Sequence, residues 1–262
     1  MMSHVKAISV KKPEEGNVLC EDASLAQEGY VVVSDGAGGG GVFADRWAKY
    51  LVDNVPSTPL VTLDDFREWF DSIWESFYNE YEQVAQQEGG MLLNKFYDEG
   101  SFATLVAAWI ADGDKVRWVA YGDSVVFHYD RTTQKLSHSF SALADFAQPP
   151  YLLNCKEEVN PDGFSTGEFD VKNPSYVFAC SDALSHYVMM MYAVACGENI
   201  SVLGDKNSNL VQLAKTKKLD FEKHVLKPLF NSLRDDRLDE HCRSLYRKGL
   251  LGLDDYSLAR LI

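Results

Sequence analysis

Residues 30–41, with the sequence YVVVSDGAGGGG, determine how the rest of the chain is interpreted. The run Tyr30–Val33 is aromatic and β-branched, as a core strand requires. Asp35 follows this run, and a glycine-rich segment and a helical pattern come next. A carboxylate between a buried strand and a glycine loop is a candidate site residue, although an aspartate after a strand is also an ordinary turn or cap residue.

Three further aspartates occupy similar places in the sequence. Asp123 and Asp182 each end a strand-like run, whereas Asp254 comes just before one. A carboxylate at the end of one strand and another at the start of a second lie on the same rim only if the strands are antiparallel. We therefore expect antiparallel central sheets with these carboxylates on one rim.

The Glu21-Asp22 pair belongs to the same rim if the chain turns at Glu28-Gly29. Such a hairpin places Asp22 opposite Asp35. Several converging carboxylates repel one another unless they are protonated or bridged by cations. Oxygen ligands suit Mg²⁺ or Mn²⁺ rather than zinc, so we hypothesise a dinuclear site for hard cations.

The remaining patterns predict an α+β fold. Residues 62–88 carry an aromatic stripe at helical spacing, which we interpret as a core-facing helix that begins at Thr62 and Asp65. No repeat or linker divides the chain, so residues 1–262 are expected to form a single domain. The other expected elements are strands at 116–121, 125–129 and 176–180, and helices at 43–53, 183–195, 208–216 and 221–247.

Composition excludes several classes of protein. The 262 residues include 25 basic and 39 acidic side chains, which gives a formal net charge of −14 and argues against nucleic acid as a partner. The longest apolar run, Val188–Cys196, is much shorter than the about 20 residues of a membrane-spanning helix. No secretory signal is visible, and the five cysteines include no Cys-x-x-Cys pair. We therefore expect a cytoplasmic protein without disulfides or membrane partners.

The glycine segment also matches G-x-G-x-x-G at positions 36, 38 and 41. This spacing is typical of dinucleotide-binding loops, which place pyrophosphate against bare backbone amides. Asp35 would repel that pyrophosphate unless a metal intervened, and such a fold needs a parallel sheet. A metal-binding loop, in which Gly36 lets its carbonyl approach the ion, and a flexible turn are the other interpretations.

Six stretches in order resemble the metal-dependent protein phosphatase family (PPM, the type 2C serine/threonine phosphatases). They are CEDA at 20–23, VSDGAGG at 33–39, GSFATL at 100–105, YGDS at 121–124, ACSDAL at 179–184 and DDYS at 254–257. The resemblance runs from about residue 8 to the C-terminus. It identifies the chain as a divergent member of the bacterial type.

The resemblance implies a four-layer α-β-β-α sandwich with two central antiparallel sheets. It also implies two Mg²⁺ or Mn²⁺ ions, and a third in bacterial-type members, with a bridging water that attacks phosphoserine or phosphothreonine of a phosphoprotein. Asp35 and Asp182 would be the catalytic carboxylates. The implied metal ligands are Asp35, the Gly36 carbonyl, a carboxylate of the pair Glu21 and Asp22, Asp182, Asp254 and, for the third ion, Asp123.

This sequence departs from the family pattern at several positions. Asn17 stands where the family has an arginine that grips the substrate phosphate, and Ala37 stands where some members have a histidine proposed as general acid. Ala183 and Val125 replace a usual glycine and arginine. His186 lies one helical turn after Asp182 and is a candidate general acid. A surface or core role explains this histidine as well, so the general acid is unassigned.

The favoured function is metal-dependent hydrolysis of phosphoserine or phosphothreonine in proteins. The alternative is a phosphatase-like regulatory or binding module that retains metals but has little turnover. A third alternative, a nucleotide-binding oxidoreductase, requires a parallel sheet, which the strand-end aspartates do not favour.

Overall fold

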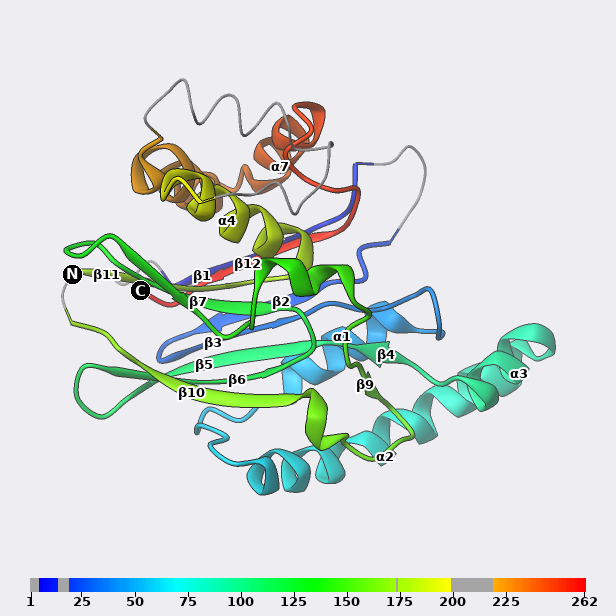
Figure 1. Cartoon of the computed structure of the whole chain (residues 1–262). Coiled ribbons are helices and arrows are strands. Elements are labelled where there is room, and N and C mark those ends of the chain that lie inside the picture. The colour runs from blue at the N-terminus through cyan, green and yellow to red at the C-terminus, as the bar shows by residue number, and fades with distance from the viewer. Residues whose placement is uncertain (1–4, 14–18, 173, 199–218) are drawn as a thin grey trace.

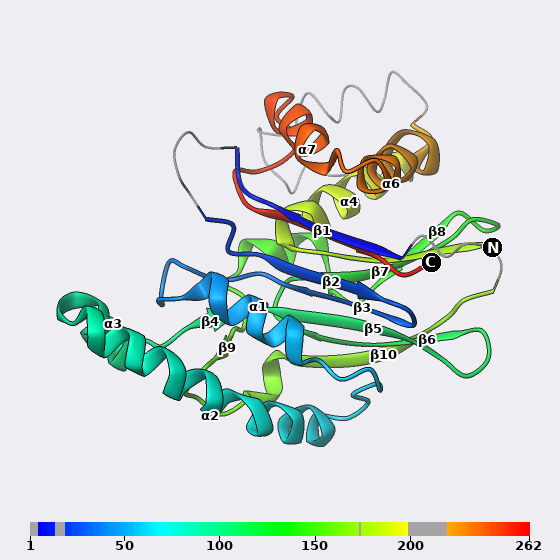
Figure 2. The same cartoon turned by 180° about the vertical axis from the view of Figure 1, so that it is seen from behind.

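The computed structural model describes residues 5–13, 19–172, 174–198 and 219–262. Two five-stranded sheets lie face to face, and helices cover the outer face of each (Figures 1 and 2). Every strand ladder in the described part of the chain is antiparallel. The expected four-layer α-β-β-α sandwich is therefore confirmed.

The first sheet has the strand order β10-β6-β5-β3-β2. Its members are β2 (Ala23–Gln27), β3 (Tyr30–Ser34), β5 (Leu105–Ala111), β6 (Lys115–Tyr121) and β10 (Phe164–Asp170). The helices α1 (Ala44–Asn54), α2 (Leu63–Glu88) and α3 (Gly90–Asp98) pack against it. All five residues of β3 are buried, because this strand has packed layers on both of its faces.

The second sheet has the order β1-β12-β11-β7-β8. It contains β1 (Lys6–Val10), β7 (Val125–Asp130), β8 (Lys135–His138), β11 (Ser175–Cys180) and β12 (Tyr256–Arg260). Its outer face is covered by α4 (Asp182–Ala195), the π-helical turn η5 (Glu222–Leu226), α6 (Lys227–Arg234) and α7 (Leu238–Arg247). A two-stranded ladder of β4 (Phe102–Ala103) and β9 (Leu153–Asn154), and the 3-10 turns η1 (Leu143–Ala147) and η2 (Pro161–Gly163), complete the described elements.

Three hydrophobic layers hold these elements together. Tyr30 and Val32 of β3 face the helices on one side, whereas Val31 and Val33 face the opposite sheet. The layer between the sheets consists mostly of Val and Ala, whose small side chains let the sheets approach closely. The alternation along β3 therefore joins two of the three layers through a single strand.

Most of the predicted elements are present. The strands expected at 30–33, 116–121, 125–129 and 176–180 correspond to β3, β6, β7 and β11. The helix expected at 62–88 is α2, and Thr62 and Asp65 form a reciprocal capping box at its start. The helices expected at 43–53 and 183–195 are α1 and α4.

One helix prediction is wrong, and one cannot be compared with the structure. The stretch 221–247 is not continuous, because the chain turns between α6 and α7 at Asp236, where φ is 57°. Aspartate tolerates this left-handed conformation better than most residues do. The helix expected at 208–216 lies outside the described residues, and α3 was not predicted. Among the described helices, none is long and apolar enough to cross a membrane.

Candidate active site

The β2–β3 hairpin brings the first two carboxylates together. Gln27 pairs with Tyr30 and Ala23 with Ser34, which is the predicted register, so Asp22 and Asp35 lie just beyond the last pair. Asp22 is 7% exposed, whereas Asp35 is partly exposed at the mouth of the site. The position of both carboxylates follows from the tight turn at Gly29.

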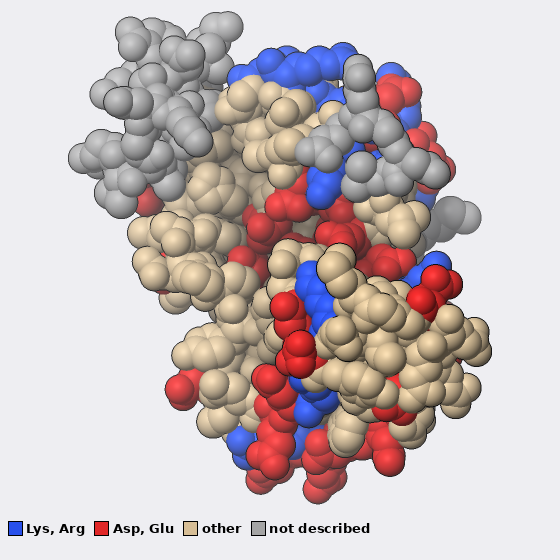
Figure 3. All heavy atoms as spheres, turned by 90° about the vertical axis from the view of Figure 1, so that its right-hand side faces the viewer, with Lys and Arg blue, Asp and Glu red and all other residues tan. Residues whose placement is uncertain are grey.

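The second sheet delivers further carboxylates to the same place. Asp182 follows β11 at the first position of α4, where its carboxylate accepts a hydrogen bond from the Ala183 amide. It also lies within hydrogen-bonding contact of Asp35. Asp254 precedes β12, which pairs with β11. Figure 3 shows acidic side chains gathered in the recess at this end of the molecule.

The electrostatics confirm that these groups face one another. Burial, and then the negative charges of Asp22, Asp182, Asp254 and Asp123, raise the pKa of Asp35 well above its usual range. Burial also raises the pKa of Asp22, and the charge of Asp182 adds to this effect. Neighbouring buried carboxyl groups cannot all remain charged at low cost, which is why the pKa of Asp35 and that of Asp182 are both raised.

The outer members of the cluster are less strongly perturbed. Burial is the first cause that raises the pKa of Asp123, Asp182 and Asp254, each to about 6. The neighbouring aspartates Asp254, Asp123 and Asp182, respectively, add to this effect. Among the ion pairs formed by the described residues, none involves these three carboxylates or those of Asp22 and Asp35. Within the part of the chain that the structure describes, these aspartates therefore have no close ion-pair partner, and the positive charge of Lys12 opposes the rise in the pKa of Asp254 that burial causes.

Hydroxyl groups lie among and beneath the carboxylates. Ser181 and Ser257 lie beside the Asp22 carboxyl and oppose the rise in its pKa that burial causes. The Thr104 hydroxyl accepts a hydrogen bond of 3.1 Å from the Asp35 amide and shares one of 2.7 Å with Ser124. The sequence analysis assigned no role to these residues, although serine or threonine occurs in five of the six family-like stretches.

Asp255 is a further residue that the sequence analysis did not single out. It is 3% exposed, and its two oxygens accept hydrogen bonds of 2.6 Å from the backbone amides of Lys12 and Glu21. It therefore fixes the segment before β2 to the segment before β12. Its charge also contributes to the raised pKa of Asp22. The signal in the sequence was the doubled aspartate at 254–255.

The structure separates the members of the Glu21-Asp22 pair. Asp22 enters the cluster, whereas the Glu21 carboxylate lies against Gly38, where an added Cβ would overlap it. At Gly36 an added Cβ would lie 2.5 Å from the Glu21 carbonyl oxygen and 2.7 Å from that of Ala44. Close packing against backbone atoms therefore requires glycine at position 36, whereas at position 38 the flexible Glu21 side chain could move aside. The antiparallel sheet around this loop rules out the dinucleotide-binding interpretation.

The other predicted site residues have different outcomes. Asn17 lies outside the described residues. Ala37 is tied to the β4 segment, because its amide donates a hydrogen bond of 2.9 Å to the Phe102 carbonyl. His186 is partly buried and lines the same cavity as Asp182 and Asp254.

The donor atoms of the aspartate cluster suit the expected metal ions in their chemistry, although they are not arranged around an ion. No group of three or more His, Cys, Asp or Glu side chains in the described part of the chain is already arranged around a metal position. The chemistry of the donors nevertheless fits a hard cation, because the cluster consists of carboxylates and hydroxyls. Asp22 Oδ2 is also buried without a hydrogen-bond partner.

Comparison with known proteins supports the fold. Serine/threonine phosphatase Stp1 from Staphylococcus aureus superposes with a TM-score of 0.52 at 16% identity, over 99% of this chain and 94% of that one. The catalytic domain of serine threonine protein phosphatase PstP, solved with two manganese ions, superposes with a TM-score of 0.52 at 15% identity, over 98% of this chain and 96% of that one. The chain has the fold of bacterial serine/threonine phosphatases.

The Mycobacterium tuberculosis serine/threonine phosphatase PstP/Ppp gives the same picture, with a TM-score of 0.52 at 17% identity over 98% of this chain and 97% of that one. No protein-family model matches the sequence, and no curated protein is significantly similar to it. The shared fold thus extends over nearly the whole chain although few residues are identical.

Proposed function

We propose that this protein is a metal-dependent serine/threonine phosphatase that hydrolyses phosphoserine and phosphothreonine in proteins. One observation carries the proposal: aspartates from separate strands and both sheets converge in one recess, and none of them forms an ion pair with a described residue. Such a cluster is costly for the metal-free protein, and divalent cations reverse that cost. The shared phosphatase fold supports the same conclusion.

Two ions, Mg²⁺ or Mn²⁺, fit this donor set. Asp35 would contribute to both, the Gly36 carbonyl and a carboxylate of the Glu21-Asp22 pair to one, and Asp182 and Asp254 to the other. Asp123 lies beside Asp182 and Asp254 and would hold a third, weaker ion. Bound ions would supply Lewis-acid activation of water and neutralisation of the phosphate charge.

The protein's own groups would orient these ligands. The Ala183 amide fixes one oxygen of Asp182, and the hydroxyls of Ser181 and Ser257 lie beside Asp22. Burial raises the pKa of both Glu21 and Asp254, and the charge of Lys12 opposes this rise, so its positive charge lies near the rim, where it would attract a phosphate dianion. Preorganised charges of this kind reduce the cost of binding a phosphoryl group.

The test is hydrolysis of p-nitrophenyl phosphate with Mn²⁺, with EDTA, and with Mn²⁺ for Asp35→Asn. We expect activity in the first condition and a loss of at least about a hundredfold in the other two. Asp112→Asn is the matched control, because Asp112 is exposed in the β5–β6 turn. Calorimetry with Mn²⁺ should show metal binding to the control and weaker binding to Asp35→Asn. Equal hydrolysis in all conditions would overturn the proposal.

The same experiment addresses the alternative of a binding module. Metal binding without hydrolysis would favour a module that retained its ions and lost turnover. We propose further that residues 1–262 act as one domain in the cytoplasm. The five cysteines are all free, and four of them are at least partly buried, which is compatible with a reducing compartment.

A further inference from the structure

A cavity of about 400 Å³ opens beside the aspartate cluster on the side of α4. Asp182 and Asp254 form one wall, and Phe146, His186, Met190 and Leu250 contribute to the rest. The cavity thus begins at two proposed metal ligands and continues away from them.

Apart from the two aspartates, the lining is mostly apolar. The His186 ring packs edge-on against Phe146, with ring centroids 5.5 Å apart. Met190 is 1% exposed and Leu251 is 7% exposed, so two well-packed core residues form part of the wall. Of the described residues that line the cavity, none is Lys or Arg.

A second cavity, of about 350 Å³, lies on the other side of η1 and has a different character. Asp123, Asp145 and Asp162 contribute to its lining. The turn η1 separates the two cavities, because Asp145 lines one of them and Phe146 the other. Phe146 is held in place by Phe140, with ring centroids 4.4 Å apart. The second cavity thus has three acidic residues in its lining and is divided by η1 from the cavity beside Asp182 and Asp254.

We propose that the cavity beside Asp182 and Asp254 receives an apolar side chain of the phosphoprotein, from a residue adjacent to the phosphorylated one. This inference rests on the proposed function. Neighbouring Cα atoms are about 3.8 Å apart, so a phosphate held at the carboxylates places an adjacent side chain within reach of the cavity. Its volume suits one large side chain rather than a folded domain. Burying an apolar side chain against Phe146 and Leu250 supplies the binding energy.

The test compares the kcat/KM of phosphothreonine peptides that carry Leu or Ser at the position before, or the position after, the phosphorylated residue. With Mn²⁺ present, we expect Leu to be preferred by about tenfold at one of these positions. The measured quantity is the kcat/KM of the Leu peptide divided by that of the Ser peptide for the same protein variant. This ratio does not depend on the amount of active enzyme.

Phe146→Ala should reduce this ratio to near one, and Leu250→Ser is a second variant in case the first fails to fold. Tyr151→Ala is the matched control, since Tyr151 lines the other cavity and is 47% exposed; it should retain the preference. Hydrolysis of both peptides without a preference at either position, or a preference that survives in both cavity variants, would overturn the inference alone. Failure to hydrolyse either the peptides or p-nitrophenyl phosphate would instead overturn the proposed function, and the inference with it.

Discussion

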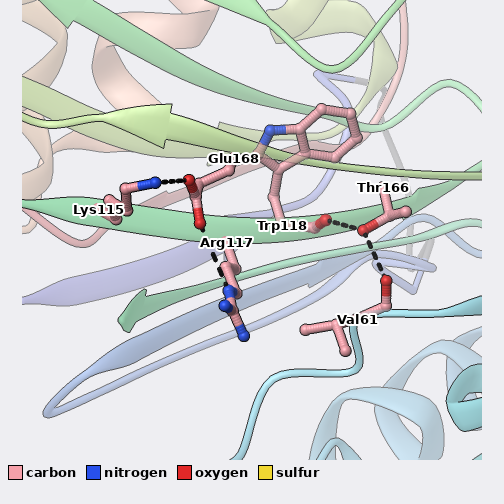
Figure 4. Close-up of polar contacts among 6 residues, drawn as sticks. All are labelled: Val61, Lys115, Arg117, Trp118, Thr166 and Glu168. Carbon is pink, nitrogen blue, oxygen red and sulfur yellow. Dashed lines mark hydrogen bonds and ion pairs between the residues drawn. The ribbon is translucent and has the colours of Figure 1, made fainter. Parts of the chain in front are cut away.

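Carboxylates in two regions of this protein have opposite surroundings. Glu168 on β10 is held by Lys115 and Arg117 of the neighbouring β6, as Figure 4 shows. The hydrogen bond and positive charge of Lys115 lower the pKa of Glu168. At the rim, burial and like charges raise the pKa of Asp35. The charge of Glu168 is stabilised by neighbouring basic side chains of the protein, whereas the charge of Asp35 needs a proton or an added cation to be stabilised.

The largest expected effect is on activity, which substitutions in the aspartate cluster should reduce and a substitution at Glu168 should not. Asp182→Asn should reduce p-nitrophenyl phosphate hydrolysis by at least about a hundredfold, because an amide is a poor ligand for a hard cation. Glu168→Gln should change the rate by less than about twofold, since a surface ion pair lies outside the proposed site. Steady-state kinetics with Mn²⁺ measures both. A comparable loss in the two variants would remove the distinction between the regions.

The second effect concerns pH in the absence of metal. The pKa of Asp123, Asp182 and Asp254 is about 6 in the folded protein, above the ordinary value of 3.8, so the folded state binds more protons than the unfolded state between these pH values. Stability should therefore fall as pH rises from about 4 to about 6, by on the order of 3 kcal/mol for one isolated group and less for each coupled group.

Urea denaturation in EDTA at about pH 4.5 and about pH 7 checks this direction. The double variant Asp123→Asn with Asp254→Asn should show a smaller decrease, because the amides do not titrate. Glu168 acts with the opposite sign, since its lowered pKa contributes stability that is lost only as the pH falls through that value. Metal-free protein that is more stable at the higher pH would contradict the raised pKa values.

A smaller effect should follow the loss of one buried acceptor. Asp255→Asn leaves one oxygen for the two backbone amides of Lys12 and Glu21, which should cost about 1–3 kcal/mol of unfolding free energy. Asp130→Asn is the control, because Asp130 accepts two backbone hydrogen bonds at a single oxygen in an exposed turn, so asparagine keeps an acceptor for both. Chemical denaturation of both variants tests the prediction. An equal loss would show that the second acceptor oxygen of Asp255 does not matter.

The smallest expected effect is the change in thermal stability when the ion-paired Glu168 is replaced. Glu168→Gln should leave the unfolding midpoint almost unchanged and make it less dependent on salt, because exposed ion pairs are screened and contribute little. Thermal unfolding at low and high salt measures this. A clear decrease in midpoint would mean that the contacts of Lys115 and Arg117 stabilise the sheet more than exposed pairs usually do.

Some elements of the fold could be predicted from the sequence, and others could not. The hairpin register was predictable, because a tight turn at Gly29 leaves one pairing that keeps Tyr30–Ser34 in the core. The strand β10 was missed, since its residues Phe164–Asp170 are mostly exposed at a sheet edge and carry little apolar alternation. The break at Asp236 was also missed, because helical periodicity continues on either side of it.

For the candidate site, the sequence alone determined which carboxylates stand beside strands and that an antiparallel arrangement would gather them. The tertiary structure decided that Asp22, rather than Glu21, enters the cluster, that Asp255 joins the segments before β2 and β12, and that a cavity continues from Asp182 and Asp254. The physical reason is distance along the chain. Local patterns set strands and turns, whereas burial, charge coupling and cavity shape arise from groups that are up to 243 residues apart in sequence.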